Sequence, residues 1–204
     1  MMSDALRGKT ILFLGSSVTY GSAAGGVSFV EMLAEACGCR TIKEAVSGTT
    51  LVDTGEDSYI ARMKRMERGR ADLFVCQLST NDASQGLLLG ALDGRADCAT
   101  VAGAMEYIID YARRTWRCPV AFYTNPRYES DAYARMTALL DACAERYGVE
   151  IIDLWDDPGV NALAPEQRAR YMSDPIHPTL EGYRALWLPL FERRLSEILS
   201  DPDA

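Results

Sequence analysis

The feature that most constrains the fold of this chain is a repeated alternation of short apolar runs with longer segments of helical periodicity. Apolar runs of strand length lie at residues 10–14, 40–46, 72–78, 120–124 and 150–154. Helical periodicity follows them at residues 28–37, 57–68, 101–116, 130–147 and about 179–199. Strands that alternate with helices form parallel sheets covered by helices on both faces. We therefore expect an α/β protein, a three-layer α/β/α sandwich around a parallel sheet of about five strands, flavodoxin-like in architecture.

The segment at residues 57–68 illustrates how the pattern assigns faces. Ile60, Met63 and Met66 recur at helical spacing, which predicts that they point inward. The basic residues between them are then expected to point outward. After the last helix, the chain is expected to fray over residues 201–204.

Length and charge narrow the classes of function. The chain has 204 residues, and no linker, repeat or low-complexity tract divides it, so we expect one domain over residues 1–204. The formal net charge is -8, and no cluster of lysine or arginine offsets it. Nucleic-acid binding depends on neutralising phosphates with basic side chains, so no nucleic-acid partner is expected. The sequence leaves the oligomeric state open.

Two further patterns bear on location and metal binding. Residues 1–9 are polar and lack the apolar core of a signal peptide, and no later apolar run is long enough to span a bilayer. We expect a cytoplasmic protein with no membrane partner. The six cysteines include no CxxC pair, and the chain has one histidine. Reduced cysteines that pack as small apolar side chains, with no metal site, are the expectation.

Residues with useful chemistry follow the predicted strands. Ser17, Gly48, Asn81 and Asn125 come after the first four strands, and His177 lies beyond the fifth. Right-handed crossovers bring the carboxyl ends of parallel strands to one edge of the sheet. Ligands bind along that edge in folds of this kind, so we expect the functional site there.

Ser17 and His177 are the parts of a nucleophilic serine site. A serine hydroxyl becomes a useful nucleophile when a base takes its proton, and His177 is the only histidine available. Asp174 precedes it by three residues, so its carboxylate can accept the Nδ1 proton and leave Nε2 as the base. The plainer alternatives are a turn with capping serines around Ser17 and a surface loop that caps the last helix around His177.

Gly48 and Asn81 are candidates for stabilising a developing oxyanion. The amide of Asn81 can donate a hydrogen bond at a strand end, and Gly48 can offer its backbone N–H to the same oxygen. Each residue also has an ordinary interpretation, as an Asn-Asp turn and as a turn glycine.

Taken in order, these segments resemble the SGNH hydrolase superfamily, the GDSL-type esterases and lipases. GSSVTYG at residues 15–21 matches the nucleophile block, Gly48 the glycine block, STND at residues 79–82 the asparagine block, and DPIH at residues 174–177 the closing block. The resemblance covers most of the chain. Two positions depart from the pattern: Ser16 stands where the family usually has Asp, and Ser79 where it usually has Gly. The usual Asp helps to hold the loops around the site.

The resemblance implies a mechanism and its residues. Ser17 would attack an ester carbonyl while His177 takes its proton and Asp174 orients the imidazole. The N–H groups of Ser17 and Gly48 and the side chain of Asn81 would form the oxyanion hole. The implied enzyme is a carboxylic ester hydrolase that needs no cofactor and no metal. Its partner is a small-molecule ester, and the absence of a long apolar lid pattern favours short acyl groups such as acetyl on a sugar.

Two other functions stay open at this point. A flavodoxin-like FMN-binding protein also has a loop rich in Ser, Thr and Gly after its first strand, as at residues 15–22. Such a loop does not require Asp174 and His177. The second alternative is a non-catalytic SGNH-like binding module, against which the full set of catalytic residue types argues. Residues 83–99, with Leu87, Leu88, Leu89 and Leu92, are expected to shape the pocket or a dimer contact.

Overall fold

The computed structural model describes residues 4–200 and contains a parallel sheet of five strands in the order β2-β1-β3-β4-β5. The strands are β1 (Thr10–Gly15), β2 (Arg40–Ala45), β3 (Leu73–Gln77), β4 (Val120–Tyr123) and β5 (Glu150–Ile152). Every neighbouring pair is parallel, with Leu12 opposite Ile42 on one side and Phe74 on the other. All five predicted strands are confirmed. The fraying expected for residues 201–204 lies outside the described part of the chain.

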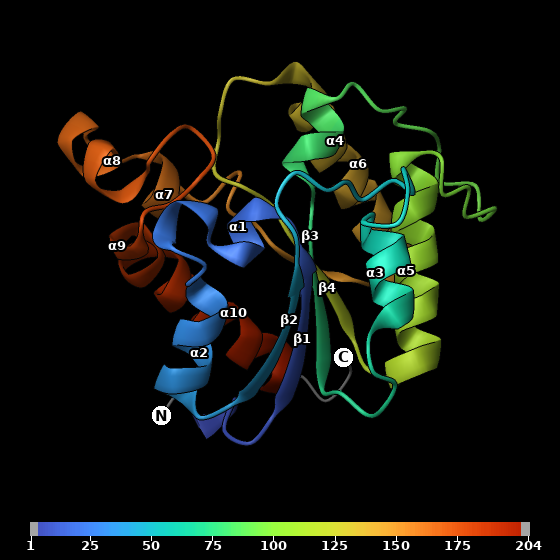
Figure 1. Ribbon diagram of the computed structural model, residues 1–204, viewed down its shortest axis with the longest axis horizontal. Coiled ribbons are helices and arrows are strands. Elements are labelled where there is room, and N and C mark those ends of the chain that lie inside the picture. Colours follow the sequence, from blue (N-terminus) through green and yellow to red (C-terminus); the bar gives the residue numbers. More distant parts are fainter. Residues whose placement is uncertain (1–3, 201–204) are drawn as a thin grey trace.

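Helices cover both faces of this sheet (Figure 1). The helices are α1 (Ser17–Tyr20), η2 (Ser22–Ala24), α2 (Phe29–Cys37), α3 (Tyr59–Arg65), α4 (Thr80–Ser84), α5 (Val101–Trp116), α6 (Asp131–Tyr147), α7 (Pro158–Asn161), α8 (Pro165–Tyr171), α9 (Leu180–Gly182), the π-helical turn η3 (Tyr183–Trp187) and α10 (Leu188–Ser200). The α/β/α sandwich expected from the sequence is confirmed. The last predicted helix is real but is divided into α9, η3 and α10.

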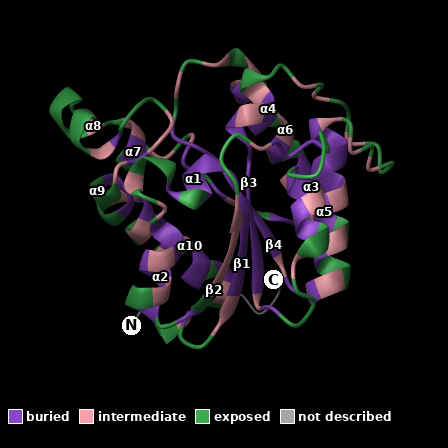
Figure 2. Ribbon diagram, in the orientation of Figure 1, coloured by how far each residue is buried: buried purple, intermediate pink, exposed green. Residues whose placement is uncertain are grey.

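Alternate side chains of β1 supply the two halves of the core. Leu12 and Leu14 join a buried cluster with residues of α3, α5 and α6, whereas Ile11 and Phe13 join a second cluster with residues of α2 and α10. This alternation is the period of a strand with both faces buried. Figure 2 shows the central strands buried and the edge strand β2 more exposed, as the sheet order requires.

Side-chain caps fix where the longer helices begin. Ser28 and Glu31 form a capping box at the start of α2, and Thr100 and Ser130 accept from backbone N–H groups at the starts of α5 and α6. These bonds satisfy donors that a helix N-terminus otherwise leaves unpaired. Ser58 caps α3 in the same way.

One prediction about α3 is wrong. Ile60 and Met63 are buried as expected, but Arg62 is buried with them and does not point outward. Its guanidinium finds hydrogen-bond partners inside the protein, which a local hydrophobic pattern does not reveal.

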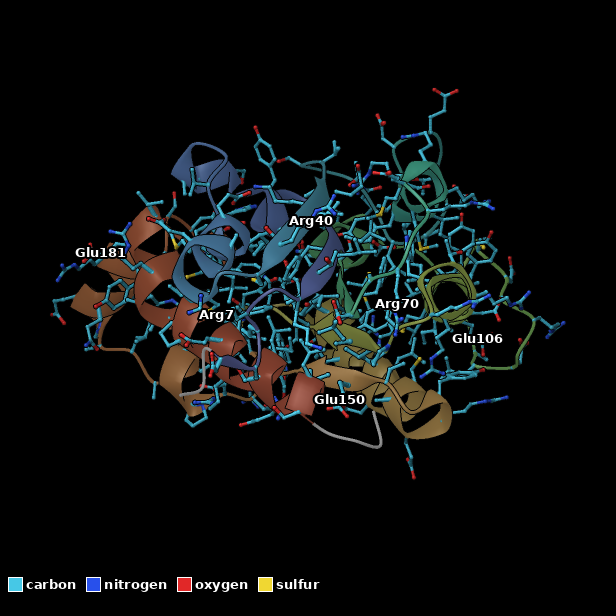
Figure 3. The ribbon with its side chains drawn as sticks, turned by 90° about the horizontal axis from the view of Figure 1, so that it is seen from below. Arg7, Arg40, Arg70, Glu106, Glu150 and Glu181 are labelled. Carbon is cyan, nitrogen blue, oxygen red and sulfur yellow. The ribbon has the colours of Figure 1, made fainter. Side chains whose placement is uncertain are left out.

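Different residues lie at the amino ends and at the carboxyl ends of the strands. At the amino ends of the strands, Arg40, Arg70 and Glu150 lie around the edge (Figure 3). At the carboxyl ends, β1 leads into α1, β3 leads through Ser79 into α4, and β4 leads into Asn125. Within residues 4–200, no helix combines the length and apolar character needed to cross a membrane.

Candidate active site

Ser17 occupies a tight turn directly after β1. It is the first residue of the short helix α1, and it is 7% exposed. The turn depends on Gly15, because a Cβ at that position would lie 1.8 Å from Oγ1 of Thr19. A side chain there would therefore force the serine turn out of place.

Gln77, the last residue of β3, holds this turn through hydrogen bonds to its side chain. Its Oε1 accepts hydrogen bonds from the Ser16 N–H at 2.9 Å, the Thr19 N–H at 3.3 Å and the Thr19 hydroxyl at 2.8 Å. The Tyr183 hydroxyl donates to the Val18 carbonyl from the other side at 2.7 Å. Both interactions are buried, so they fix the direction of the Ser17 side chain.

The structure brings Ser17, His177 and Asp174 into one chain of hydrogen bonds. Oγ of Ser17 lies 2.8 Å from Nε2 of His177, and Nδ1 of His177 lies 2.7 Å from Oδ2 of Asp174. The imidazole is one-quarter exposed, so part of the ring is open to solvent. A hydroxyl, an imidazole and a carboxylate in this order can transfer a proton from the serine and stabilise the resulting imidazolium.

Asp174 also shapes the loop that carries the histidine. Its Oδ1 accepts from the backbone N–H groups of Ile176 and His177, at 2.7 and 2.8 Å. Partial burial alone would raise the pKa of Asp174. The two backbone hydrogen bonds and the imidazole outweigh it, so the pKa lies below its ordinary value. Asp174 therefore stays ionised, as a group that orients an imidazole must.

Asn125, expected from sequence to lie at the active edge, supports this same loop. It is fully buried, and its Nδ2 donates to the Ile176 carbonyl at 3.2 Å. The loop is closed by a bond from the Ser173 N–H to the His177 carbonyl at 2.8 Å. Asn125 thus contacts the histidine loop and does not face the solvent.

Gly48 lies on the loop after β2, and Asn81 lies on α4, which contacts that loop. Gly48 adopts a φ of 81°, a conformation that favours glycine, and its N–H donates to no other residue in the described chain. Nδ2 of Asn81 donates one hydrogen to the Thr49 carbonyl at 2.8 Å. The second hydrogen of the amide is left for another acceptor. Each of these groups therefore keeps a donor hydrogen that is not used within the described chain.

Asp82, next to Asn81, anchors the loop that follows Gly48. Its carboxylate accepts from the Leu51 N–H at 2.8 Å and the Val52 N–H at 2.9 Å. Burial raises the pKa of Asp82, and hydrogen bonds from Ser79 and the two amides oppose that rise. No role was predicted from sequence for Asp82 or for Gln77. A polar residue ending an apolar strand, and a carboxylate beside the predicted asparagine, were the available signals.

The two departures from the resembled pattern have clear local roles. Ser16 is fully buried and contacts Gln77 through its N–H and, at 3.5 Å, through its hydroxyl. Ser79 caps α4, since its Oγ accepts from the N–H groups of Asn81 and Asp82. The serine at residue 79 therefore fixes the start of the helix that carries Asn81.

The leucines expected to shape the pocket pack mostly inward. Leu87, Leu89 and Leu92 contact the core cluster that includes α5, and Leu88 is the exposed member of the set. Leu88 and Leu89 also accept backbone hydrogen bonds from Val101 and Ala102 at the start of α5. These contacts tie much of residues 83–99 to α5.

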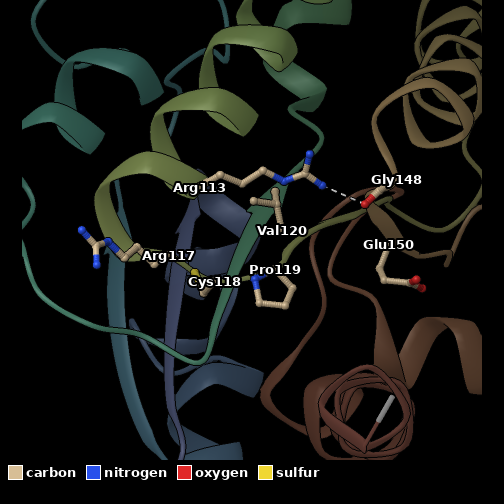
Figure 4. A pocket seen from close by; sticks show the side chains of 7 residues that line it. All are labelled: Arg113, Arg117, Cys118, Pro119, Val120, Gly148 and Glu150. Atoms are coloured by element: carbon tan, nitrogen blue, oxygen red, sulfur yellow. Dashed lines mark hydrogen bonds between the residues drawn. The ribbon is translucent and has the colours of Figure 1, made fainter. Parts of the chain in front are cut away.

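A separate pocket of about 350 Å³ lies at the opposite, amino edge of the sheet (Figure 4). It contains Cys118, Pro119 and Glu150, and the Arg113 guanidinium donates to the Gly148 carbonyl beside it. Burial raises the pKa of the Cys118 thiol to about 12, so it is not a nucleophile at neutral pH. The hydrogen-bonded serine and histidine at the other edge are the stronger site.

The cysteines and acids form no competing centre in the described chain. All six cysteines are free, and five of them are buried. Among residues 4–200, no group of three histidine, cysteine or acidic side chains is placed to hold a metal ion.

Solved structures share this fold over nearly the whole chain. A protein from Lactobacillus plantarum is 23% identical with a TM-score of 0.78, over 95% of this chain and 97% of that one. A carbohydrate acetylesterase family member from Sinorhizobium meliloti is 18% identical with a TM-score of 0.65, over 95% and 100%. An extracellular lipase from Streptomyces rimosus is 18% identical with a TM-score of 0.60, over 91% and 99%. The curated proteins contain no match.

These likenesses define the class of fold, a three-layer α/β/α sandwich that known hydrolases also use. The family follows from the sequence itself: residues 13–185 match the model of the GDSL-like Lipase/Acylhydrolase family, and the chain belongs to that family. Its class of chemistry is ester hydrolysis.

Proposed function

We propose that this protein is a serine esterase that cleaves carboxylic esters with short acyl groups through an acyl-enzyme. The observation that carries the proposal is the chain of hydrogen bonds through Ser17, His177 and Asp174. Oγ lies 2.8 Å from Nε2, and Nδ1 lies 2.7 Å from Oδ2. The geometry fits the spacing needed between a nucleophile and its base.

The reaction has two halves. In the first, Ser17 Oγ bonds to the carbonyl carbon as Nε2 of His177 takes the hydroxyl proton. The carbon–oxygen bond to the alcohol then breaks, and the imidazolium returns the proton to the leaving alcohol. In the second half, His177 takes a proton from water, which attacks the acyl carbon. The bond between the acyl carbon and Ser17 Oγ then breaks, and the imidazolium returns its proton to Oγ, which restores the hydroxyl as the carboxylic acid leaves.

The oxyanion formed in each half needs hydrogen-bond donors. The candidates are the N–H groups of Ser17 and Gly48 and the free amide hydrogen of Asn81. Such donors act on charge that develops in the transition state, and the loss of one costs about 10²- to 10³-fold in rate. Two neighbouring residues support this role. Asp82 holds the loop that follows Gly48, and Ser79 caps the helix that carries Asn81.

A short acyl group is the best-supported substrate. The carbohydrate acetylesterase family member from Sinorhizobium meliloti shares the fold, which favours acetyl esters of a carbohydrate or small molecule. The apolar side chains of residues 83–99 agree, because Leu87, Leu89 and Leu92 are packed on the core and do not form a free apolar wall.

The flavin alternative is less well supported. A phosphate loop needs free backbone N–H groups, but those of Ser16 and Thr19 are bonded to Gln77. A non-catalytic binding module has no need for a serine held 2.8 Å from an imidazole.

The test is hydrolysis of p-nitrophenyl esters of increasing chain length, followed by acetylated sugars, with Ser17→Ala as the control. We expect kcat/KM to be highest for acetate and to fall with chain length. Preference for long chains would contradict the short-acyl assignment. A yellow purified protein with bound flavin and no hydrolysis would favour the alternative.

A further inference from the structure

Arg62 is a buried charge close to the site. It lies on α3 and is 2% exposed, while its ion-pair partner Glu44, 3.2 Å away, is partly open to solvent. Burying a guanidinium is costly unless its donors are paired. Here Nε donates to the Asp57 carbonyl at 2.9 Å, and the group also lies over the Tyr59 ring. These contacts hold the Arg62 guanidinium in one position.

A single nitrogen of Arg62 joins the two loops of the proposed site. Its Nη2 donates to the Gly15 carbonyl at 2.8 Å and to Oγ1 of Thr49 at 3.0 Å. Gly15 ends β1 two residues before Ser17, and Thr49 directly follows Gly48. The carbonyl of the same Thr49 accepts from Asn81. Arg62 therefore reaches both the nucleophile turn and the loop of the oxyanion candidates.

The chemistry of the guanidinium suits this link. Its donors are fixed in one plane, and hydrogen bonds from a charged donor are stronger than those between neutral groups. A lysine ammonium has the same charge but lacks the fork that reaches several acceptors in set directions. The two loops also contact each other directly, through a bond from the Val46 N–H to the Gly15 carbonyl at 3.3 Å.

We propose that Arg62 is a positioning residue that sets the distance between the Ser17 turn and the Gly48–Asn81 oxyanion donors. This inference rests on the esterase function proposed above. A shift of these donors relative to the serine reduces stabilisation of the transition state more than it reduces substrate binding. Its main effect is therefore a lower kcat.

The first test is Arg62→Lys, which keeps the charge beside Glu44. Misplacement of catalytic groups by about 1 Å can cost roughly 10²-fold, so we expect kcat on p-nitrophenyl acetate to fall about 10- to 100-fold. KM should change less than about threefold. Arg113→Lys is the control, since Arg113 bonds to a carbonyl at the opposite edge of the sheet. A kcat within about twofold of the wild type in Arg62→Lys would overturn the proposal.

A second variant removes the acceptor on the oxyanion loop. Thr49→Val should lower kcat several-fold. Arg62→Lys should then lower kcat by a smaller factor in the Thr49→Val background than in the wild type, because both changes remove the hydrogen bond from Arg62 Nη2 to Thr49 Oγ1. Thr50→Val is the matched control: its hydroxyl bonds to Val52 and Thr54 and not to Arg62. Fully multiplicative effects of Arg62→Lys and Thr49→Val would contradict a shared link.

Hydrogen–deuterium exchange separates this inference from the esterase assignment. Arg62→Lys should speed exchange in both residues 15–21 and residues 46–52. Unchanged exchange in either loop, or a change confined to α3, would overturn the link whatever the activity. A wild type that hydrolyses no ester would overturn the esterase function, and with it the effect of Arg62 on catalysis. An active wild type together with an unchanged kcat in Arg62→Lys would overturn this inference but not the esterase function.

Discussion

The hydroxyl of Ser17 lies 2.8 Å from Nε2 of His177, although 160 residues separate the two in sequence. Separate elements hold the two side chains: Gln77 holds the serine turn at the end of β1, and Asn125 holds the histidine loop that follows α8. Both supports come from the carboxyl ends of strands, so the parallel sheet itself sets the distance between nucleophile and base.

Removing the histidine should be as damaging as removing the serine. His177→Ala leaves Ser17 without a base, and we expect kcat for p-nitrophenyl acetate to fall by about 10⁴-fold or more. The double variant with Ser17→Ala should be scarcely worse, because the two residues act as a unit. Steady-state kinetics on all three variants checks this. Near wild-type hydrolysis by His177→Ala would contradict the mechanism.

Asp174→Asn should affect both rate and stability. An amide can stabilise the wrong imidazole tautomer and cannot stabilise the imidazolium, so we expect a kcat loss of up to about 10⁴-fold. In the folded protein the pKa of Asp174 lies below its ordinary value of 3.8. Its ionised form therefore stabilises the fold above that pH, and this contribution disappears as pH falls through the lowered pKa.

Thermal unfolding as a function of pH measures the second effect. The Tm difference between the wild type and Asp174→Asn should be full near neutral pH and should shrink in strongly acid solution. A difference that grows as pH falls would show that the sign of the pKa shift is wrong.

Gly15 gives a test of the serine turn with a matched control. Gly15→Ala places a Cβ against Thr19 and Gln77, so we expect a loss of about 1–3 kcal/mol in stability and a lower kcat. At Gly69 a Cβ meets no atom within 4 Å, and Gly69→Ala should leave both nearly unchanged. Chemical denaturation and ester kinetics on the pair measure this. Equal behaviour of the two variants would contradict the role given to Gly15.

Much of the fold could be predicted because buried parallel strands are continuous apolar runs. The five strands lie where the runs indicate, and the amphipathic pattern at residues 101–116 has the same bounds as α5. The short helices α1 and α4 could not be read in this way. They span four and five residues, too few for a period, and their place depends on Gln77 and on the Ser79 cap.

The site shows the same division between local pattern and distant contact. Ser17, Gly48 and Asn81 could be placed at one edge because each follows a strand, and His177 because it lies beyond the fifth strand, before the last helix. Arg62 could not, since its acceptors Gly15 and Thr49 are distant in sequence and the helix pattern assigned it to solvent. The catalytic roles and the single domain over residues 1–204 stay predictions that experiments must test.

The most direct test of the central claim is covalent labelling with a fluorophosphonate probe, read by peptide mass spectrometry. We predict one labelled site, Ser17, with labelling lost in both Ser17→Ala and His177→Ala. Ser16, fully buried beside Gln77, should stay unmodified. Labelling at Ser16, or undiminished labelling of Ser17→Ala, would contradict the assignment of Ser17 as the nucleophile.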